Sequence, residues 1–276
     1  MPDHWPAHGI GWRSCVPELP DVEGFRRELA TTLPRRRIRH VTVKDPGILR
    51  NTTAKAFARR LDGHRFATPS RHGKWLMLPT DGPTLLIHSG MTGHPYYAAD
   101  GADEIGYERL VISLDKGELR YADLRKLRGV WLADNDKDVA HVTGPQGPDA
   151  LGLDLRAFRE VLSGKRTGSR SLKATLMDQS VVAGLGNLLT DEICWRAKIR
   201  PTRRVAELDN DDVAGLHRAM TQVLRTAVRH GRVPRLARWL TGTRDEPDPH
   251  CPRCGTRLDH GRVGGRTTLW CPRDQP

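Results

Sequence analysis

The pattern of apolar residues changes its period near residue 150, and this change limits the folds open to the chain. Between residues 17 and 133, one helical pattern is followed by short apolar or β-branched runs separated by turn signals, as in Trp75–Leu78 and Thr84–Ile87. From about residue 152 to residue 230, apolar residues recur at intervals of three and four, which is typical of amphipathic helices. The two patterns predict a sandwich or barrel of strands followed by a helical region.

A first helix is expected directly after the sequence Pro-Glu-Leu-Pro at residues 17–20. Val22, Phe25 and Leu29 lie three and four residues apart and therefore share one helical face. Residues 1–15 show neither such a period nor the apolar stretch of a secretory signal. We therefore expect residues 1–15 to be a non-native or disordered extension outside the fold.

The second half of the chain predicts several helices and one linker. Asp154 is placed to cap a helix, and the longest helix is expected from Asp211 to His230. Further helices are expected at residues 171–179 and after Asn187. Residues 233–249 are rich in Pro and Arg, which predicts a linker.

The charge of the chain favours a nucleic-acid partner. Its 276 residues carry a formal net charge of +12 and give a pI of about 10.0, with Lys and Arg spread along the whole length. No apolar run approaches the roughly 18 residues needed to span a bilayer, so we expect no membrane partner. Five cysteines without a secretory signal argue against a disulfide framework and favour a reducing cytoplasm.

The C-terminal segment carries a pattern that indicates a metal site. Two paired-ligand knuckles, separated by a hairpin with Gly264-Gly265 at its turn, are typical of a zinc ribbon. The candidate ligands are Cys251, Cys254, Cys271 and Asp274. A carboxylate is unusual in a structural zinc site, so His250 or His260 could supply the fourth ligand instead. A hairpin held by packing alone is the alternative.

Several separate stretches resemble the formamidopyrimidine-DNA glycosylase and endonuclease VIII family, whose bacterial members are DNA glycosylases with abasic-site lyase activity. The N-terminal match is Pro-Glu-Leu-Pro-Asp-Val-Glu at residues 17–23. The longest match runs from Leu172 to Pro201, and its Gly-Leu-Gly-Asn at residues 184–187 is similar to the helix–two-turn–helix motif of the family. Further matches lie at residues 71–76, 88–93, 123–127 and 264–271.

The resemblance implies an α+β multidomain fold with three parts. These are an N-terminal β-sandwich with one helix at residues 16–135, a helical domain with the helix–two-turn–helix at residues 150–245, and a C-terminal zinc-ribbon β-hairpin at residues 246–276. One structural Zn²⁺ would be bound in the hairpin. Residues 1–15 lie outside the resemblance.

The resemblance also implies a bifunctional enzyme of base excision repair. The secondary amine of Pro17 would attack C1′ of an extruded nucleotide, release the oxidised base and form a Schiff base. Glu18 would move protons at the sugar and base, Lys74 would assist at the sugar and phosphate, and Arg266 would grip the phosphates at the lesion. β-Elimination and then δ-elimination would nick the strand.

Five further residues would contact DNA if the resemblance holds. Met91, Arg125 and Leu127 would fill the space left by the extruded nucleotide. Asn187 would bind a phosphate, and Lys173 would contact DNA from the same matched segment. The implied partner is damaged double-stranded DNA, bound by a monomeric protein of the bacterial cytoplasm that associates with the nucleoid.

Pro17 is internal in this sequence, and an amide nitrogen cannot act as the nucleophile. We expect translation to start at a GTG codon read as Val16, so that removal of the initiator Met frees Pro17. The alternative is a non-catalytic paralogue that binds damaged DNA with a blocked proline. A zinc-ribbon transcription factor is a weaker alternative, because no helix for reading the major groove stands out. Within the resemblance, the short segment at residues 231–250 argues against a preference for 8-oxoguanine and leaves formamidopyrimidines and oxidised pyrimidines open as lesions.

Overall fold

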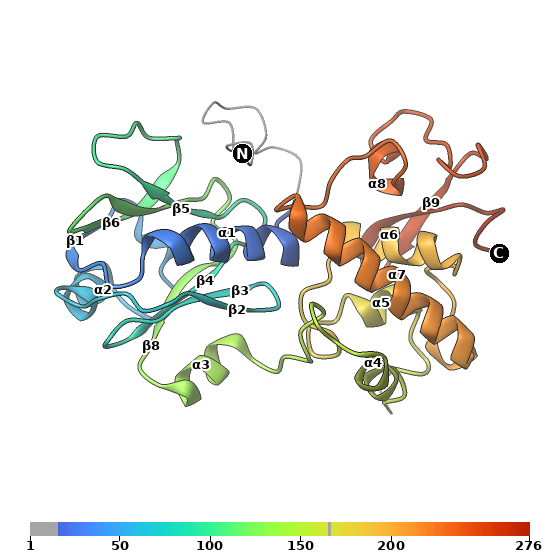
Figure 1. Ribbon diagram of the computed structural model, residues 1–276, viewed down its shortest axis with the longest axis horizontal. Helices are drawn as coiled ribbons and strands as arrows, with labels where there is room; N and C mark the ends of the chain where they lie inside the picture. The colour runs from blue at the N-terminus through green and yellow to red at the C-terminus, as the bar shows by residue number, and fades with distance from the viewer. Residues whose placement is uncertain (1–15, 165–166) are drawn as a thin grey trace. The chain divides into compact units, whose positions relative to one another are not determined.

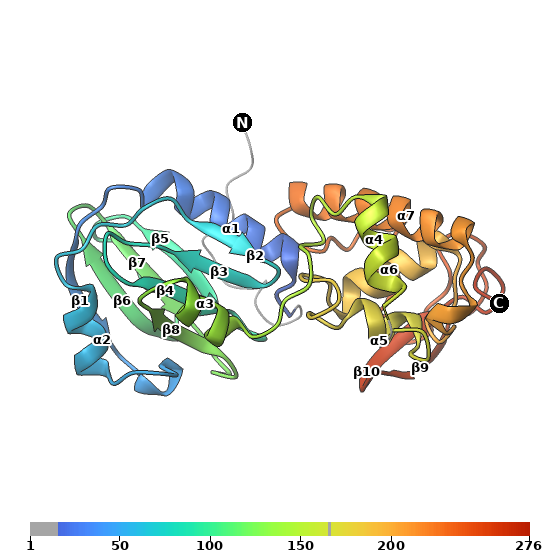
Figure 2. The same ribbon diagram turned by 90° about the horizontal axis from the view of Figure 1, so that it is seen from below.

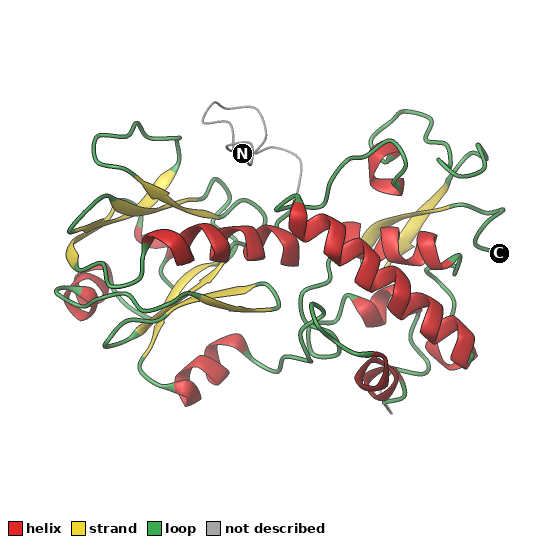
Figure 3. Ribbon diagram, in the orientation of Figure 1, coloured by secondary structure: helices red, strands yellow, loops and turns green. Residues whose placement is uncertain are grey.

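The computed structural model describes residues 16–164 and 167–276, which divide into two compact units. Of the described residues, the first unit contains residues 16–17 and Val22–Gly144, and the second contains Glu18–Asp21 and the chain from Pro145 to Pro276. Most strands belong to the first unit and most helices to the second (Figure 3). The expectation for residues 1–15 lies outside the described residues.

Two four-stranded antiparallel sheets form the first unit (Figures 1 and 2). One sheet contains, in spatial order, β1 (Ile38–Val43), β6 (Glu108–Leu114), β7 (Glu118–Ala122) and β5 (His94–Ala98). The other contains β2 (Ser70–His72), β3 (Trp75–Leu78), β4 (Thr84–His88) and β8 (Gly129–Ala133). Side chains from both sheets, such as Leu76, Ile87 and Ile112, bury in one core. The strands therefore form a sandwich rather than a closed barrel.

The helix α1 (Leu19–Thr32) contributes to the same core. Val22, Phe25 and Leu29 are buried there, which confirms the helical face predicted from their spacing. The first unit also contains α2 (Ala54–Leu61), α3 (Asp136–Thr143) and a 3₁₀ turn at Pro46–Ile48. The sequence predicted only one helix in this part of the chain. Thr53 and Asn135 cap α2 and α3 through their side-chain oxygens.

The second unit is helical. Asp154 caps α4 (Leu155–Leu162) as predicted, because its Oδ1 accepts the N–H of Ala157 at 2.8 Å. The helix α5 (Leu172–Leu176) is shorter than expected, because Asp178 turns the chain by accepting the N–H of Ser180 at 2.9 Å. It is followed by α6 (Asn187–Ala197), a 3₁₀ turn (Val205–Glu207), α7 (Asn210–Arg229) and α8 (Leu240–Thr243).

The segment predicted as a linker packs into the second unit. Val233 and Trp239 are buried in the core of the helical part, and Leu240 is buried against α6 and the C-terminal hairpin. The prediction of a linker at residues 233–249 was therefore wrong, since the segment lies inside the second unit. The many Pro and Arg residues suggested an exposed segment, but burying its three apolar side chains lowers the free energy of the folded chain.

The C-terminal hairpin consists of β9 (Asp259–Val263) and β10 (Arg266–Trp270). Gly264 and Gly265 form its turn with φ of 57° and 74°, which confirms the turn predicted from the glycine pair. The hairpin shares a small core with Trp195 of α6. Among the described residues, no helix is long and apolar enough to cross a bilayer.

Candidate functional site

Glu18 lies buried at the start of α6. Its Oε1 accepts the N–H of Leu188 at 2.8 Å, and its Oε2 accepts the N–H of Leu189 at 3.2 Å. The first N–H groups of a helix lack intrahelical partners and lie at the positive end of the helix dipole, so they favour an ionised carboxylate. The helix start predicted to bind a phosphate therefore also holds the proposed catalytic carboxylate.

The glycines before α6 are explained by this contact. A Cβ on Gly186 would lie 2.2 Å from Cδ of Glu18, and one on Gly184 would lie 2.4 Å from Cδ1 of Leu19. Gly184 also accepts the N–H of Leu19 through its carbonyl at 3.1 Å and has a φ of 110°. Close approach of residues 18 and 19 thus requires glycine at both positions. Sequence reasoning assigned these glycines to a phosphate and missed the carboxylate.

Asp21 is a second carboxyl group beside Glu18 that sequence reasoning left without a role at the site. Its Oδ2 accepts the backbone N–H of Glu18 at 2.9 Å. Burial of the carboxyl group, with a smaller contribution from the negative charge of Glu18, raises the pKa of Asp21 to about 7. The proposed catalytic segment thus contains a group that titrates near neutral pH.

Asn187 is the first residue of α6 and is half-buried. Within the described parts of the chain, its Oδ1 has no hydrogen-bond partner. An amide group at a helix start suits a phosphate contact, because the positive end of the dipole attracts the anion. The phosphate-binding role of Asn187 stays a prediction.

Lys74 lies in the turn between β2 and β3, and a chain of contacts fixes this turn. Arg71 donates from Nη1 to the carbonyl of Gly73 at 2.9 Å and from Nε to Glu23 at 3.2 Å. Burial alone would raise the pKa of Glu23, but hydrogen bonds from Arg26, Arg27 and Arg71 lower it to about 2. Glu23 on α1 therefore anchors, through Arg71, the turn that carries Lys74.

Asp123 joins the two loops predicted to fill the space of an extruded nucleotide. Its Oδ1 accepts the hydroxyl of Thr92 at 2.6 Å and the N–H groups of Arg125 and Lys126 at 3.1 Å. The hydroxyl of Thr92 in turn accepts the N–H of Arg125 at 2.9 Å. The loops after β4 and after β7 are thereby held side by side within the first unit.

The predicted wedge residues lie on these two loops. Nη1 of Arg125 approaches Sδ of Met91 at 2.9 Å, so the structure brings these two side chains together. Leu127 follows on the same loop with 52% of its surface exposed, and Leu124 is 50% exposed. Exposed leucines on a loop are available to insert between bases. Sequence reasoning did not single out Leu124.

His88 supports the loop that carries Met91. Its Nδ1 accepts the N–H of Gly90 at 3.1 Å. Burial and the positive charges of Arg128 and Lys74 lower the pKa of His88 to about 4. A neutral His88 can therefore act as this acceptor throughout the physiological pH range.

The structure does not support a direct contact between Lys173 and DNA. The side chain is fully buried, and its Nζ donates to Oδ1 of Asp191 at 2.6 Å and to the carbonyl of Thr267 at 3.2 Å. Breaking a buried ion pair costs about 3–5 kcal/mol. An exposed ion pair returns at most about 1 kcal/mol, so leaving Asp191 for a phosphate is unfavourable.

Arg266, by contrast, is exposed at the start of β10. Among the described residues its guanidinium forms no hydrogen bond or ion pair, whereas Arg262 donates across the turn to the carbonyl of Gly265 at 3.2 Å. A guanidinium without a protein acceptor is available for a phosphate. This difference supports Arg266 over Arg262 as the predicted phosphate-binding residue.

The four predicted metal ligands come together beneath the hairpin. One ligand atom from each of Cys251, Cys254, Cys271 and Asp274 lies within 4.8 Å of the other three, which is close enough to hold a metal ion. Neither His250 nor His260 belongs to this group. The indole Nε1–H of Trp195 donates to Sγ of Cys251 at 3.3 Å. The backbone N–H of Asp274 donates to Sγ of Cys271, also at 3.3 Å. Such contacts orient thiolate ligands.

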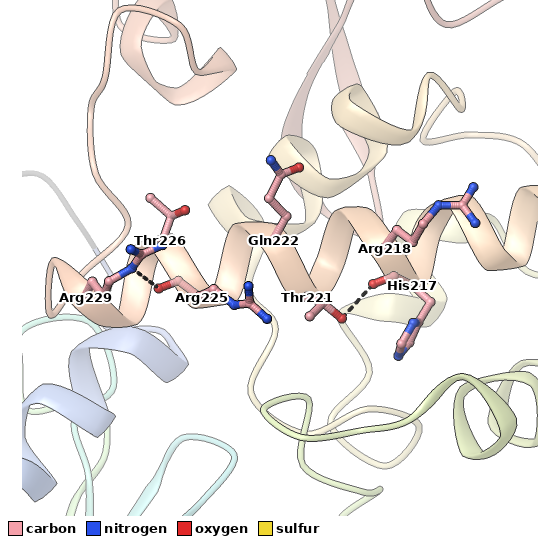
Figure 4. Close-up of a pocket in the computed structure, with 7 residues that line it drawn as sticks. All are labelled: His217, Arg218, Thr221, Gln222, Arg225, Thr226 and Arg229. Carbon is pink, nitrogen blue, oxygen red and sulfur yellow. Dashed lines mark hydrogen bonds between the residues drawn. The ribbon is translucent and has the colours of Figure 1, made fainter.

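A shallow pocket of about 470 Å³ lies on the outward face of α7 (Figure 4). Its lining consists of His217, Arg218, Thr221, Gln222, Arg225, Thr226 and Arg229. None of the predicted site residues lines it. With three arginines in its lining, the pocket adds a basic surface to the second unit.

Two family models match the chain. The formamidopyrimidine-DNA glycosylase N-terminal domain matches residues 16–130, and the formamidopyrimidine-DNA glycosylase H2TH domain matches residues 147–235. The matches therefore cover the sandwich and the helical part in the same order as the two units.

Curated relatives and solved structures match almost the whole chain. A formamidopyrimidine-DNA glycosylase of Symbiobacterium thermophilum is 35% identical, covering 95% of this chain and 90% of the relative. The enzyme of Pelotomaculum thermopropionicum is 32% identical, covering 94% of this chain and 99% of the relative. A Lactococcus lactis structure with DNA containing Fapy-dG has a TM-score of 0.82 at 29% identity and covers 94% of this chain and 99% of that chain. The sequence of the present chain, its fold and both domain models all match this family, so the chain belongs to the formamidopyrimidine-DNA glycosylase family.

Proposed function

We propose that the chain is a DNA glycosylase of base excision repair with abasic-site lyase activity. The observation that carries the proposal is the position of Glu18, whose carboxylate is fixed by two N–H groups of α6 directly after the candidate nucleophile Pro17. Asn187, the proposed phosphate ligand, begins the same helix. A carboxylate held next to a phosphate-binding helix start suits proton transfer at a nucleotide sugar.

The proposed reaction begins with a free amine on Pro17. Its nitrogen lone pair attacks C1′, the C1′–N bond of the damaged nucleotide breaks, and the base leaves with a proton. Glu18 carries protons between the proline nitrogen, the base and the sugar oxygen as the ring opens to a Schiff base. Loss of a 2′ proton then expels the 3′ phosphate, and a second elimination expels the 5′ phosphate. An α-amino group has a pKa of about 7.7–8.0, so a useful fraction is neutral near pH 7.

We propose Zn²⁺ as the metal of the C-terminal cluster. Three thiols and one carboxylate suit this borderline-soft ion, and the N–H groups that donate to two of the sulfurs orient these ligands. The ion would cross-link the two knuckles that flank β9 and β10 and so hold the hairpin that bears Arg266. Its role is structural, and no step of the reaction passes through it.

Arg266→Ala should weaken DNA binding to a similar degree for all sequences, because phosphate contacts position the duplex without reading bases. Loss of one contact should also lower the slope of log affinity against log salt by about one. Fluorescence anisotropy at several salt concentrations measures both effects. Arg262→Ala is the matched control, since this guanidinium is bound across the turn. A loss confined to one sequence would contradict the assigned role.

A panel of duplexes with single lesions tests the activity. A formamidopyrimidine is the first substrate to examine, because the relatives are formamidopyrimidine-DNA glycosylases and the Lactococcus lactis structure holds DNA that contains Fapy-dG. We expect base release and a nick at the lesion. Comparing the rates on duplexes with 8-oxoguanine and with oxidised pyrimidines then gives the order of substrate preference. Tight binding to these duplexes without any nick or base release would instead identify a non-catalytic damage-binding protein.

A further inference from the structure

A buried group of charges lies between α5, α6 and the hairpin. Lys173 on α5 and Asp191 on α6 are fully buried, and the side chain of Arg244, just after α8, is 10% exposed. Figure 2 shows β10 next to α5 within the second unit. Charged side chains are rarely buried without a specific partner, so this group calls for an explanation.

The contacts form a closed cycle. Lys173 Nζ donates to Oδ1 of Asp191 at 2.6 Å, and Arg244 Nη1 is bound to Oδ2 of the same carboxylate. Each cation also donates to one backbone atom, the carbonyl oxygen of Thr267, from Lys173 at 3.2 Å and from Arg244 at 2.7 Å. Thr267 directly follows Arg266 in β10.

Among the described residues, β10 pairs with one strand, β9, so the backbone groups along its other edge have no strand partner. Two cations on one carbonyl of this edge restrict the backbone beside Arg266 from the interior of the unit. We infer that Lys173, Asp191 and Arg244 act as a buried clamp on the Thr267 carbonyl, and that this clamp positions Arg266 for its phosphate.

This inference rests on the proposed phosphate contact of Arg266. Lys173 and Arg244 are positioning residues here, since they act through the strand and not on DNA. The clamp complements the metal cluster, which fixes the two ends of the hairpin at residues 251–254 and 271–274, whereas the clamp fixes the strand between them.

The test is a double-mutant cycle on DNA binding. Arg244→Met removes the cation nearest to solvent and leaves the Lys173–Asp191 pair balanced, so we expect the chain to fold. With a duplex that contains a tetrahydrofuran abasic-site analogue, Arg266→Ala should weaken binding about tenfold in the parent and less than about threefold in the Arg244→Met background. Asn187→Ala is the control, and its effect should be the same in both backgrounds.

The outcomes separate the clamp from the phosphate contact. An equal loss from Arg266→Ala in both backgrounds would overturn the clamp, because a merely stabilising cluster would not couple to an exposed side chain. If Arg266→Ala costs nothing in the parent, the phosphate contact is refuted, and hydrogen exchange decides the clamp. Arg244→Met should then speed amide exchange at residues 266–268 and leave the exchange rates at residues 251–254 unchanged. Unchanged exchange at residues 266–268 would overturn the clamp.

Discussion

Glu18→Gln should lower the rate of base excision about 10²- to 10⁴-fold, the range for loss of a general acid–base group. The amide is of similar size but cannot accept and return a proton. It also places an NH₂ group against one of the N–H donors of Leu188 or Leu189, where the carboxylate now accepts both. Single-turnover excision from a lesion-bearing duplex measures this effect.

The same variant should lose less activity on DNA that already contains an abasic site. No base has to leave there, so the largest proton transfer assigned to Glu18 is absent. Glu28→Gln, a matching change further along α1, is the control and should leave excision within about twofold, as expected of a residue outside the reacting groups. Excision by Glu18→Gln at the parent rate would remove Glu18 from the mechanism.

Cys254→Ala should abolish stoichiometric zinc binding and weaken DNA binding by about tenfold or more, because a structural zinc site supplies folding free energy to the hairpin. Cys254 is one of three thiols in the cluster, and the remaining ligands are too few for a tetrahedral site. Metal analysis of protein purified without chelator gives the zinc content, and anisotropy gives the affinity.

Asp274→Cys is the complementary change. It supplies a fourth thiolate in place of a harder carboxylate oxygen, so release of zinc to a chelator should slow. The side chain of Asp274 also pairs with Arg253 at 3.3 Å, a contact that the cysteine gives up. Parent protein that contains no zinc, yet binds DNA like the family, would show that packing alone holds the hairpin.

Local patterns in the sequence predicted the elements well. The apolar runs at Trp75–Leu78 and Thr84–Ile87 became paired strands, and the period from Asp211 to His230 became α7. These patterns report how a segment buries one face, and that property is local. The same approach gave a wrong prediction for residues 233–249. Pro and Arg dominate the composition of this segment, but the buried side chains of Trp239 and Leu240 determine how it packs.

The candidate site was predicted as a set of residues but not as a set of contacts. The cysteine spacing predicted the metal cluster, since ligands close in sequence must meet in a small hairpin. The contact of Glu18 with α6 spans about 170 residues, and no periodicity reports such a distant pair. Lys173 lies in a matched motif, yet a motif does not say whether a side chain points to a ligand or to the interior.

The central claim is that the amine of Pro17 forms the covalent intermediate. Borohydride reduction in the presence of abasic-site DNA, followed by peptide mapping of the adduct, tests it directly for two forms of the protein. One form starts at Pro17, and the other retains residues 1–16. We predict a stable adduct on Pro17 in the first form and none in the second, because an amide nitrogen carries no available lone pair. Equal trapping of both forms, or an adduct on Lys74, would contradict the account.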